Sequence, residues 1–149
     1  MAERHPALAR LDVLVGRWTV QPKVPGLGAG WTEFSWLENG QYLRQFSDAE
    51  PLPETAPQAW RDNNPLPTTQ VIGLDDTTET FAALYADARG VHRVYQMTFA
   101  DGAWRMWRRA PGFHQRWVAT VGDAVIDGRW ERSADGFDWA LDFELTYRR

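Results

Sequence analysis

The chain has 149 residues, of which 44% are hydrophobic and 24% are charged, and its formal net charge is −4. This length and composition predict one folded domain spanning residues 1–149 and exclude a disordered chain. The acidic balance argues against nonspecific nucleic-acid binding, and the absence of cysteine excludes disulfides and thiolate metal sites.

The N-terminal segment predicts one short helix over about residues 6–15. Apolar residues recur there at helical spacing from Leu8 to Leu14, Pro6 is tolerated in a first turn, and Gly16 can end the helix. After Gly16 the apolar period changes to two, and no later segment predicts a helix.

The remainder of the chain predicts nine or ten short antiparallel strands. They are expected at residues 18–21, 31–37, 41–47, 70–74, 81–86, 91–99, 104–109, 113–118, 125–132 and 137–147. In the first hairpin, which turns on Asn39-Gly40, Trp36 is expected on a buried face, with Tyr42 and Arg44 on the corresponding face of the return strand. Consecutive hairpins favour pairing between neighbours, and closure removes exposed edges, so the predicted fold is an all-β, up-and-down barrel.

The segment 48–69 interrupts this pattern with five prolines. Proline cannot donate to a β-ladder, so the segment predicts a long surface loop. Its single tryptophan, Trp60, is expected to clamp the loop onto the body of the domain.

The segment from Trp104 to Trp117 predicts a hairpin around Ala110-Pro111-Gly112, because proline presets φ and glycine tolerates positive φ. This turn pairs Trp107 with Gln115, and it puts both residues on the inner face together with Trp117. The assignment depends on register, since a slip of one residue moves a side chain to the other face.

The last predicted strand has the clearest alternation in the chain. Its apolar residues are Phe137, Trp139, Leu141, Phe143, Leu145 and Tyr147. One face is expected to be buried and the other solvated, which indicates an antiparallel sheet. On the preceding strand, Trp130 is expected on the same side as Ile126 and Gly128.

Several motifs together resemble an uncharacterised bacterial family, DUF1579. They include Leu14-Val-Gly16-x-Trp18, Ile72-Gly-x-Asp75, Arg93-Val-Tyr95, Ala110-Pro-Gly-Phe113 and Gly128-Arg-Trp130-Glu131. The resemblance implies a calycin-like barrel, the architecture of lipocalins, fatty-acid-binding proteins and nitrobindins, and it implies no activity. Nitrobindins bind haem, but their opening motif continues with glycines where Thr-Val-Gln-Pro follows Trp18 here.

The predicted inner faces bring together a candidate ligand site. Its members are Trp36, Tyr42, Arg44, Arg93, Tyr95, Trp107, Gln115, Trp117 and Trp130. In one interpretation the arginines, tyrosines and Gln115 hold an anionic group while the tryptophans enclose an apolar body. In the other, the arginines reach solvent along their stems and pair with nearby acids. We expect non-catalytic binding of a small hydrophobic molecule, with or without an anionic group.

Two other functions stay open at this point. A haem protein would need His114 as its ligand, because no two histidines have metal-ligand spacing, and no cofactor or metal is otherwise expected. An enzyme would need acid-base chemistry by Tyr95 or His114 inside the barrel. No catalytic residue is assigned, since the chain has neither a Gly-x-Ser-x-Gly elbow nor a glycine-rich phosphate loop.

The expected partner is therefore the small molecule itself. No apolar run approaches the ~20 residues of a membrane span. Among protein partners, a homodimer is favoured because symmetric dimers are common. The cysteine-free composition agrees with a cytoplasmic location.

Overall fold

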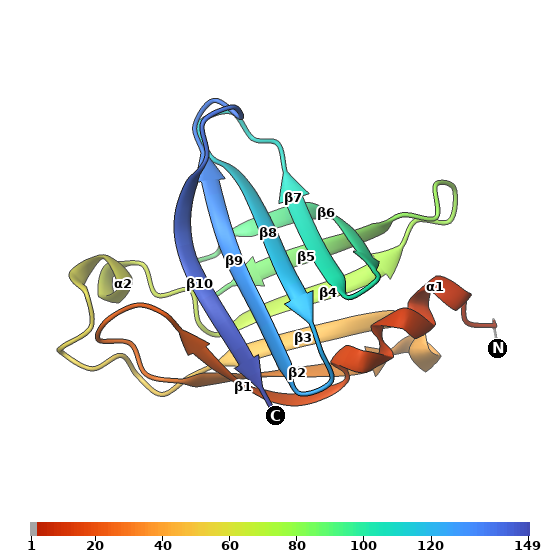
Figure 1. Ribbon diagram of the computed structural model, residues 1–149, viewed down its shortest axis with the longest axis horizontal. Coiled ribbons are helices and arrows are strands. Elements are labelled where there is room, and N and C mark those ends of the chain that lie inside the picture. The colour runs from red at the N-terminus through yellow and green to blue at the C-terminus, as the bar shows by residue number, and fades with distance from the viewer. Residues whose placement is uncertain (1–2) are drawn as a thin grey trace.

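Ten antiparallel strands close into one up-and-down barrel in the computed structural model, which describes residues 3–149 (Figure 1). The strands are β1 (Gly16–Pro22), β2 (Gly30–Leu37), β3 (Tyr42–Asp48), β4 (Thr68–Leu74), β5 (Phe81–Asp87), β6 (His92–Ala100), β7 (Ala103–Arg108), β8 (His114–Val121), β9 (Val125–Ser133) and β10 (Ala140–Arg148). Each strand pairs with its neighbour in the chain, and β1 closes the barrel against β10. The predicted all-β class and strand order are confirmed.

The predicted N-terminal helix is present and covers one end of the barrel (Figure 1). It consists of α1 (Pro6–Ala9) followed by a 3-10 helix, η1 (Arg10–Leu14). The ring of His5 accepts a hydrogen bond from the Ala7 N–H at 3.0 Å and thereby caps α1. Three leucines of this segment, Leu8, Leu11 and Leu14, are buried and fill the end of the barrel.

Trp18 organises this closed end. Its indole N–H donates to the Leu14 carbonyl at 2.8 Å, and the Arg149 guanidinium lies 3.9 Å from the centre of its ring. Arg149 also donates to the carbonyls of Val13 and Val15, both at 2.7 Å. The two ends of the described chain are therefore tied together around one buried ring.

The apolar core is one cluster of side chains inside the barrel. Besides the three leucines, it contains Trp18, Phe34, Leu43, Ile72, Phe81, Met97 and Phe99, together with Trp104, Met106, Trp117 and Tyr147. The last four side chains also line a cavity.

The β7–β8 hairpin differs from the prediction by one residue in register. The turn spans Ala110–Phe113, because the Phe113 N–H donates to the Ala110 carbonyl at 2.8 Å and Gly112 takes a φ of 93°. Its centre therefore lies between Pro111 and Gly112, whereas the predicted turn was centred on Pro111.

This shift changes the face of one strand only. Gln115 pairs with Arg108 and Trp117 pairs with Met106, so Gln115 and Trp117 are buried as predicted. Trp107 instead pairs with the neighbouring Arg116 and lies on the outer face, so its predicted inner position was wrong.

The face predicted for β3 was also wrong. Tyr42 is 45% exposed, and Arg44 stacks on Phe46 at 4.9 Å on the same outer face. Leu43 and Gln45 point inward instead. The prediction assumed that the face with the larger apolar set is buried, but apolar and aromatic side chains can also cover the outside of a sheet.

β10 begins later than predicted. The Asp135 carboxylate accepts hydrogen bonds from two following N–H groups and forms a turn there, and Phe137 is 87% exposed. A register shift between Leu141 and Phe143 then moves Leu141 out of the core, where it is 54% exposed. Only the last part of the alternating segment, which ends at Tyr147, faces inward.

The proline-rich connection between β3 and β4 contains a short helix, α2 (Gln58–Asp62), which sequence periodicity did not predict. Pro57 begins it, and its carbonyl accepts from Trp60 and Arg61. The Trp60 ring packs edge-on against Phe143 at 5.0 Å, as expected of a clamp. α1 and α2 lie at opposite ends of the barrel (Figure 1). Within residues 3–149, no helix has the length and apolar content needed to cross a membrane.

Candidate functional site

A cavity of about 190 Å³ lies toward the end of the barrel opposite α1. Its inner wall is made by side chains that include Val20, Gln45, Gln70, Tyr85, Trp104, Met106, Trp117, Trp130, Leu145 and Tyr147. Its mouth is bordered by Leu27 of the β1–β2 connection and by Leu52, Trp60 and Leu66 of the β3–β4 connection. The proline-rich segment therefore covers the cavity.

The cavity wall is held by aromatic packing. Trp117 contacts Trp104 at 5.5 Å, Trp130 at 5.4 Å and Tyr147 at 6.2 Å between ring centres. Gly128 on β9 allows this arrangement, since a Cβ at that position would lie only 2.2 Å from the Trp117 ring. The indole N–H groups of Trp104 and Trp117 are buried and have no hydrogen-bond partner among the described residues.

Three neutral polar side chains within this wall are joined by two consecutive hydrogen bonds. The Gln70 amide donates to Gln45 Oε1 at 3.1 Å, and the Gln45 amide donates to the Tyr147 hydroxyl at 3.4 Å. Burial raises the pKa of Tyr147 to about 12, so its hydroxyl stays protonated at neutral pH. No described residue accepts the Tyr147 proton, so this hydroxyl can donate into the cavity.

The lining of the cavity is almost uncharged. Among residues 3–149, no arginine, lysine or histidine lines it, and the one charged residue there is Asp48 near the mouth. Asp48 Oδ1 already accepts a hydrogen bond from the Ala49 N–H at 2.9 Å. The cavity therefore offers apolar surface and neutral hydrogen-bonding groups.

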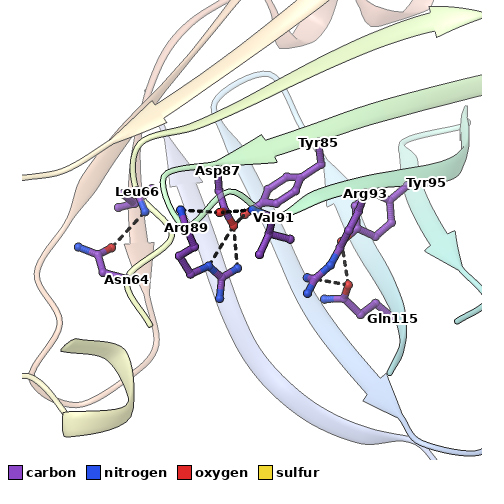
Figure 2. Close-up of polar contacts among 9 residues, drawn as sticks. All are labelled: Asn64, Leu66, Tyr85, Asp87, Arg89, Val91, Arg93, Tyr95 and Gln115. Carbon is purple, nitrogen blue, oxygen red and sulfur yellow. Dashed lines mark hydrogen bonds and ion pairs between the residues drawn. The ribbon is translucent and has the colours of Figure 1, made fainter. Parts of the chain in front are cut away.

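Three of the predicted site residues meet each other outside the cavity (Figure 2). Tyr95 donates to Gln115 Oε1 at 2.8 Å, and Arg93 donates to the same oxygen at 3.1 Å. Tyr95 packs against Tyr85 and Trp130, which both line the cavity. One interpretation of the sequence brought these three residues together with Tyr42 and Arg44. The structure joins Arg93, Tyr95 and Gln115 behind the aromatic wall, whereas Tyr42 and Arg44 lie on the outer face of β3.

A second polar group, missed in the sequence, lies beside them (Figure 2). The Tyr85 hydroxyl donates to Asp87 Oδ2 at 2.8 Å, and Arg89 donates to the same oxygen at 2.7 Å. Burial raises the pKa of Tyr85, while the pKa of Asp87 is lowered because the bonds from Arg89 and Tyr85 outweigh the opposing effect of burial. Asp87-Ala-Arg89 in a predicted turn was the available signal.

The other predicted site residues lie away from the cavity. Trp36 is at the closed end, where its indole N–H donates to Asp12 at 2.9 Å and Arg4 stacks on its ring at 4.9 Å. Tyr42, Arg44 and Trp107 belong to outer faces. Of the nine predicted residues, Trp117 and Trp130 line the cavity.

His114, the candidate haem ligand, does not line the cavity. It occupies the strand face opposite to Gln115, and its Nδ1 accepts a hydrogen bond from the Ala110 N–H at 2.9 Å. In the described part of the chain, no three His, Cys, Asp or Glu side chains group as metal ligands. The cavity residues therefore do not fit a histidine-ligated haem.

The sequence did not predict that Gln45 and Gln70 lie inside the barrel. Gln45 and Gln70 alternate with the buried Leu43 and Ile72, and that parity was the signal that could have identified them. The alternation in the last strand predicted that Tyr147 lies on the inner face, but it assigned no role in ligand binding to this residue.

The chain matches no protein-family model and no curated protein sequence. The functional interpretation therefore depends on the geometry of the barrel and its cavity.

Proposed function

We propose that the barrel binds one small, mainly apolar molecule in the cavity opposite α1 and does not transform it. The observation that supports this most is the combination of an aromatic wall with the neutral series Gln70, Gln45 and Tyr147. Ligand pockets typically combine apolar walls with a few polar groups that fix orientation.

The size of the cavity favours a ligand of about one ring with a short substituent. An engineered apolar cavity of about 150 Å³ can hold benzene, and pockets for drug-sized ligands are about 300–1,000 Å³. The 190 Å³ cavity falls between these sizes. A haem group or a long acyl chain is therefore a poor fit.

The charge of the lining favours a neutral ligand over an anionic one. A buried carboxylate needs a cation or several donors, and no basic side chain lines the cavity. A hydroxyl or carbonyl group, in contrast, can hydrogen-bond with Tyr147 and Gln45.

Binding is favoured over acid-base catalysis by the tyrosines near the cavity. Burial raises the pKa of Tyr95, and that of Tyr147 reaches about 12. A general base works best when its pKa is near the working pH, so these hydroxyls act better as hydrogen-bond donors than as bases.

Native mass spectrometry of freshly purified protein, followed by calorimetric titration with p-cresol and toluene, tests the proposal. We expect saturable binding of p-cresol, and binding of toluene weaker by about fivefold because it lacks the hydroxyl hydrogen bond. Val20→Phe should abolish binding by filling the cavity.

The matched control is Thr19→Phe, which adds a ring at the neighbouring outward position of β1. It should bind p-cresol like the unmodified protein. Equal p-cresol binding by Val20→Phe, or no binding of p-cresol together with a mass free of adducts, contradicts the proposal.

Three broader expectations also remain proposals. Membership of the DUF1579-like calycin family is supported by the ten-stranded barrel and by Gly16-Arg-Trp18 at the start of β1. Homodimer formation is supported by exposed apolar residues on β3, β5 and β6, namely Tyr42, Leu84 and Val94, and light scattering tests it. A cytoplasmic location is supported by the cysteine-free composition, and cell fractionation tests it.

A further inference from the structure

The barrel wall has a gap between β6 and β7. The last pair of this ladder toward the cavity end is Gln96 with Trp107, although β6 extends back to His92. A groove of about 370 Å³ lies there. It is lined by His92, Arg93, Val94, Gln96, Trp107, Arg108, Arg109 and Ala110.

The groove is lined by residues from both faces of the barrel wall. Trp107 and Val94 come from the outer faces of their strands, whereas Arg93 and Arg108 belong to the inner faces. The lining shares no residue with that of the barrel cavity. The groove is thus a separate candidate site.

Basic side chains dominate this groove, and no acidic residue of the described part of the chain lines it. Arg93 is hydrogen-bonded to the neutral Gln115, and neither Arg108 nor Arg109 has a carboxylate within ion-pair distance among residues 3–149. Other arginines of the same chain do have such partners, since Arg89 holds Asp87 and Arg116 holds Glu131. Three arginines without a carboxylate partner therefore line one groove on a protein whose net charge is −4.

Arg93 is held in position before any ligand arrives. Its guanidinium lies 5.2 Å from the centre of the Phe113 ring, and one nitrogen donates to Gln115 at 3.1 Å. A guanidinium has five N–H donors in a planar fork, so other donors remain for an oxyanion. Arg93 and Arg108 also act on the same hydroxyl, because both oppose the rise of the Tyr95 pKa that burial causes.

We propose that the β6–β7 groove binds the oxyanion group, carboxylate or phosphate, of a small molecule at Arg93 and Arg108, separately from the ligand of the barrel cavity. Two guanidinium groups without carboxylates match the charge and planar geometry of such a group. Trp107 and Val94 provide apolar surface at the same groove for the remainder of the molecule.

The test is a titration of the full chain with inorganic phosphate and, separately, with benzoate, followed by calorimetry and by NMR of the arginine side-chain N–H groups. We expect saturable binding of at least one anion. Arg108→Gln should weaken it about tenfold, the effect of losing one charge-assisted hydrogen bond. The stronger of the two anions identifies the oxyanion as phosphate or carboxylate.

The matched control is Arg105→Gln, an exposed arginine on the same strand outside the groove, which should change the affinity by less than about twofold. Absence of saturation by both anions, or equal weakening by both variants, overturns the proposal. If Arg108→Gln does not fold, Arg93→Gln replaces it under the same criteria. Titration with p-cresol reports on the barrel cavity, so failure of either proposal is recognised separately.

Discussion

Gly128 on β9 lies against the ring of Trp117, and its replacement by alanine tests the packing of the whole cavity wall. An added Cβ would lie 2.2 Å from Cη2 and 2.4 Å from Cζ2 of that ring. Carbon atoms normally pack at about 3.5–4.0 Å, so the ring would have to move by about 1.3 Å or more. Trp104, Trp130 and Tyr147 contact the ring and resist that movement.

The expected cost follows from two opposing effects. Overpacking a well-packed core typically costs about 1–3 kcal/mol, whereas replacing glycine by alanine at a compatible backbone position recovers about 0.4–1 kcal/mol. Gly128 does not have a positive φ, so the second effect applies. We expect Gly128→Ala to lower the free energy of unfolding by about 1–2 kcal/mol and Tm by about 2–8 °C.

Urea and thermal denaturation measure this change. Gly28→Ala is the matched control because a Cβ at Gly28 meets no atom within 4 Å, and its unfolding free energy should stay within about 0.5 kcal/mol. Adding Trp117→Phe to Gly128→Ala should cost less than the sum of the two single changes, since the smaller ring leaves room for the methyl group. Unchanged stability of Gly128→Ala would refute the packing of Trp117 over Gly128.

Three further changes test other parts of the molecule. Arg149→Ala should lower the unfolding free energy by about 1–3 kcal/mol, because it removes the stack on Trp18 and three hydrogen bonds to carbonyls; a loss below about 0.5 kcal/mol in urea denaturation contradicts this. The pKa of Tyr147 is raised to about 12, so the folded state holds this proton more tightly and stability should fall as pH rises from about 10 to 12. Tyr147→Phe should flatten that decline, and an equally steep decline in pH-dependent denaturation argues against a buried hydroxyl. Trp60→Ala should speed proteolysis of the β3–β4 connection about fivefold by removing the contact with Phe143, and an unchanged cleavage rate contradicts the clamp.

The fold could be predicted because it depends on local alternation and on turn residues. Period-two patterning and the turns between strands predicted ten segments close to those observed, and the N-terminal helix was predicted from Leu8, Leu11 and Leu14. These signals are repeated along the chain, so an error at one element does not change the class of fold.

The site could be predicted only in part, because each of its members depends on register. A turn centred half a residue later moved Trp107 outward and brought Met106 to the cavity wall, and a bulge removed Leu141 from the core. The assumption that the face with the larger apolar set is buried was wrong for β3, where Gln45 lines the cavity.

The sequence by itself determined an antiparallel barrel with a short N-terminal helix, since alternation and turn chemistry are properties of neighbouring residues. Only the tertiary structure decided that Gln45, Gln70 and Tyr147 meet inside the barrel and that Arg93 and Arg108 meet at a gap in its wall. Gln45, Gln70 and Tyr147 come from β3, β4 and β10, and Arg93 and Arg108 come from β6 and β7, so barrel closure, side-chain size and strand register together set the distances between them.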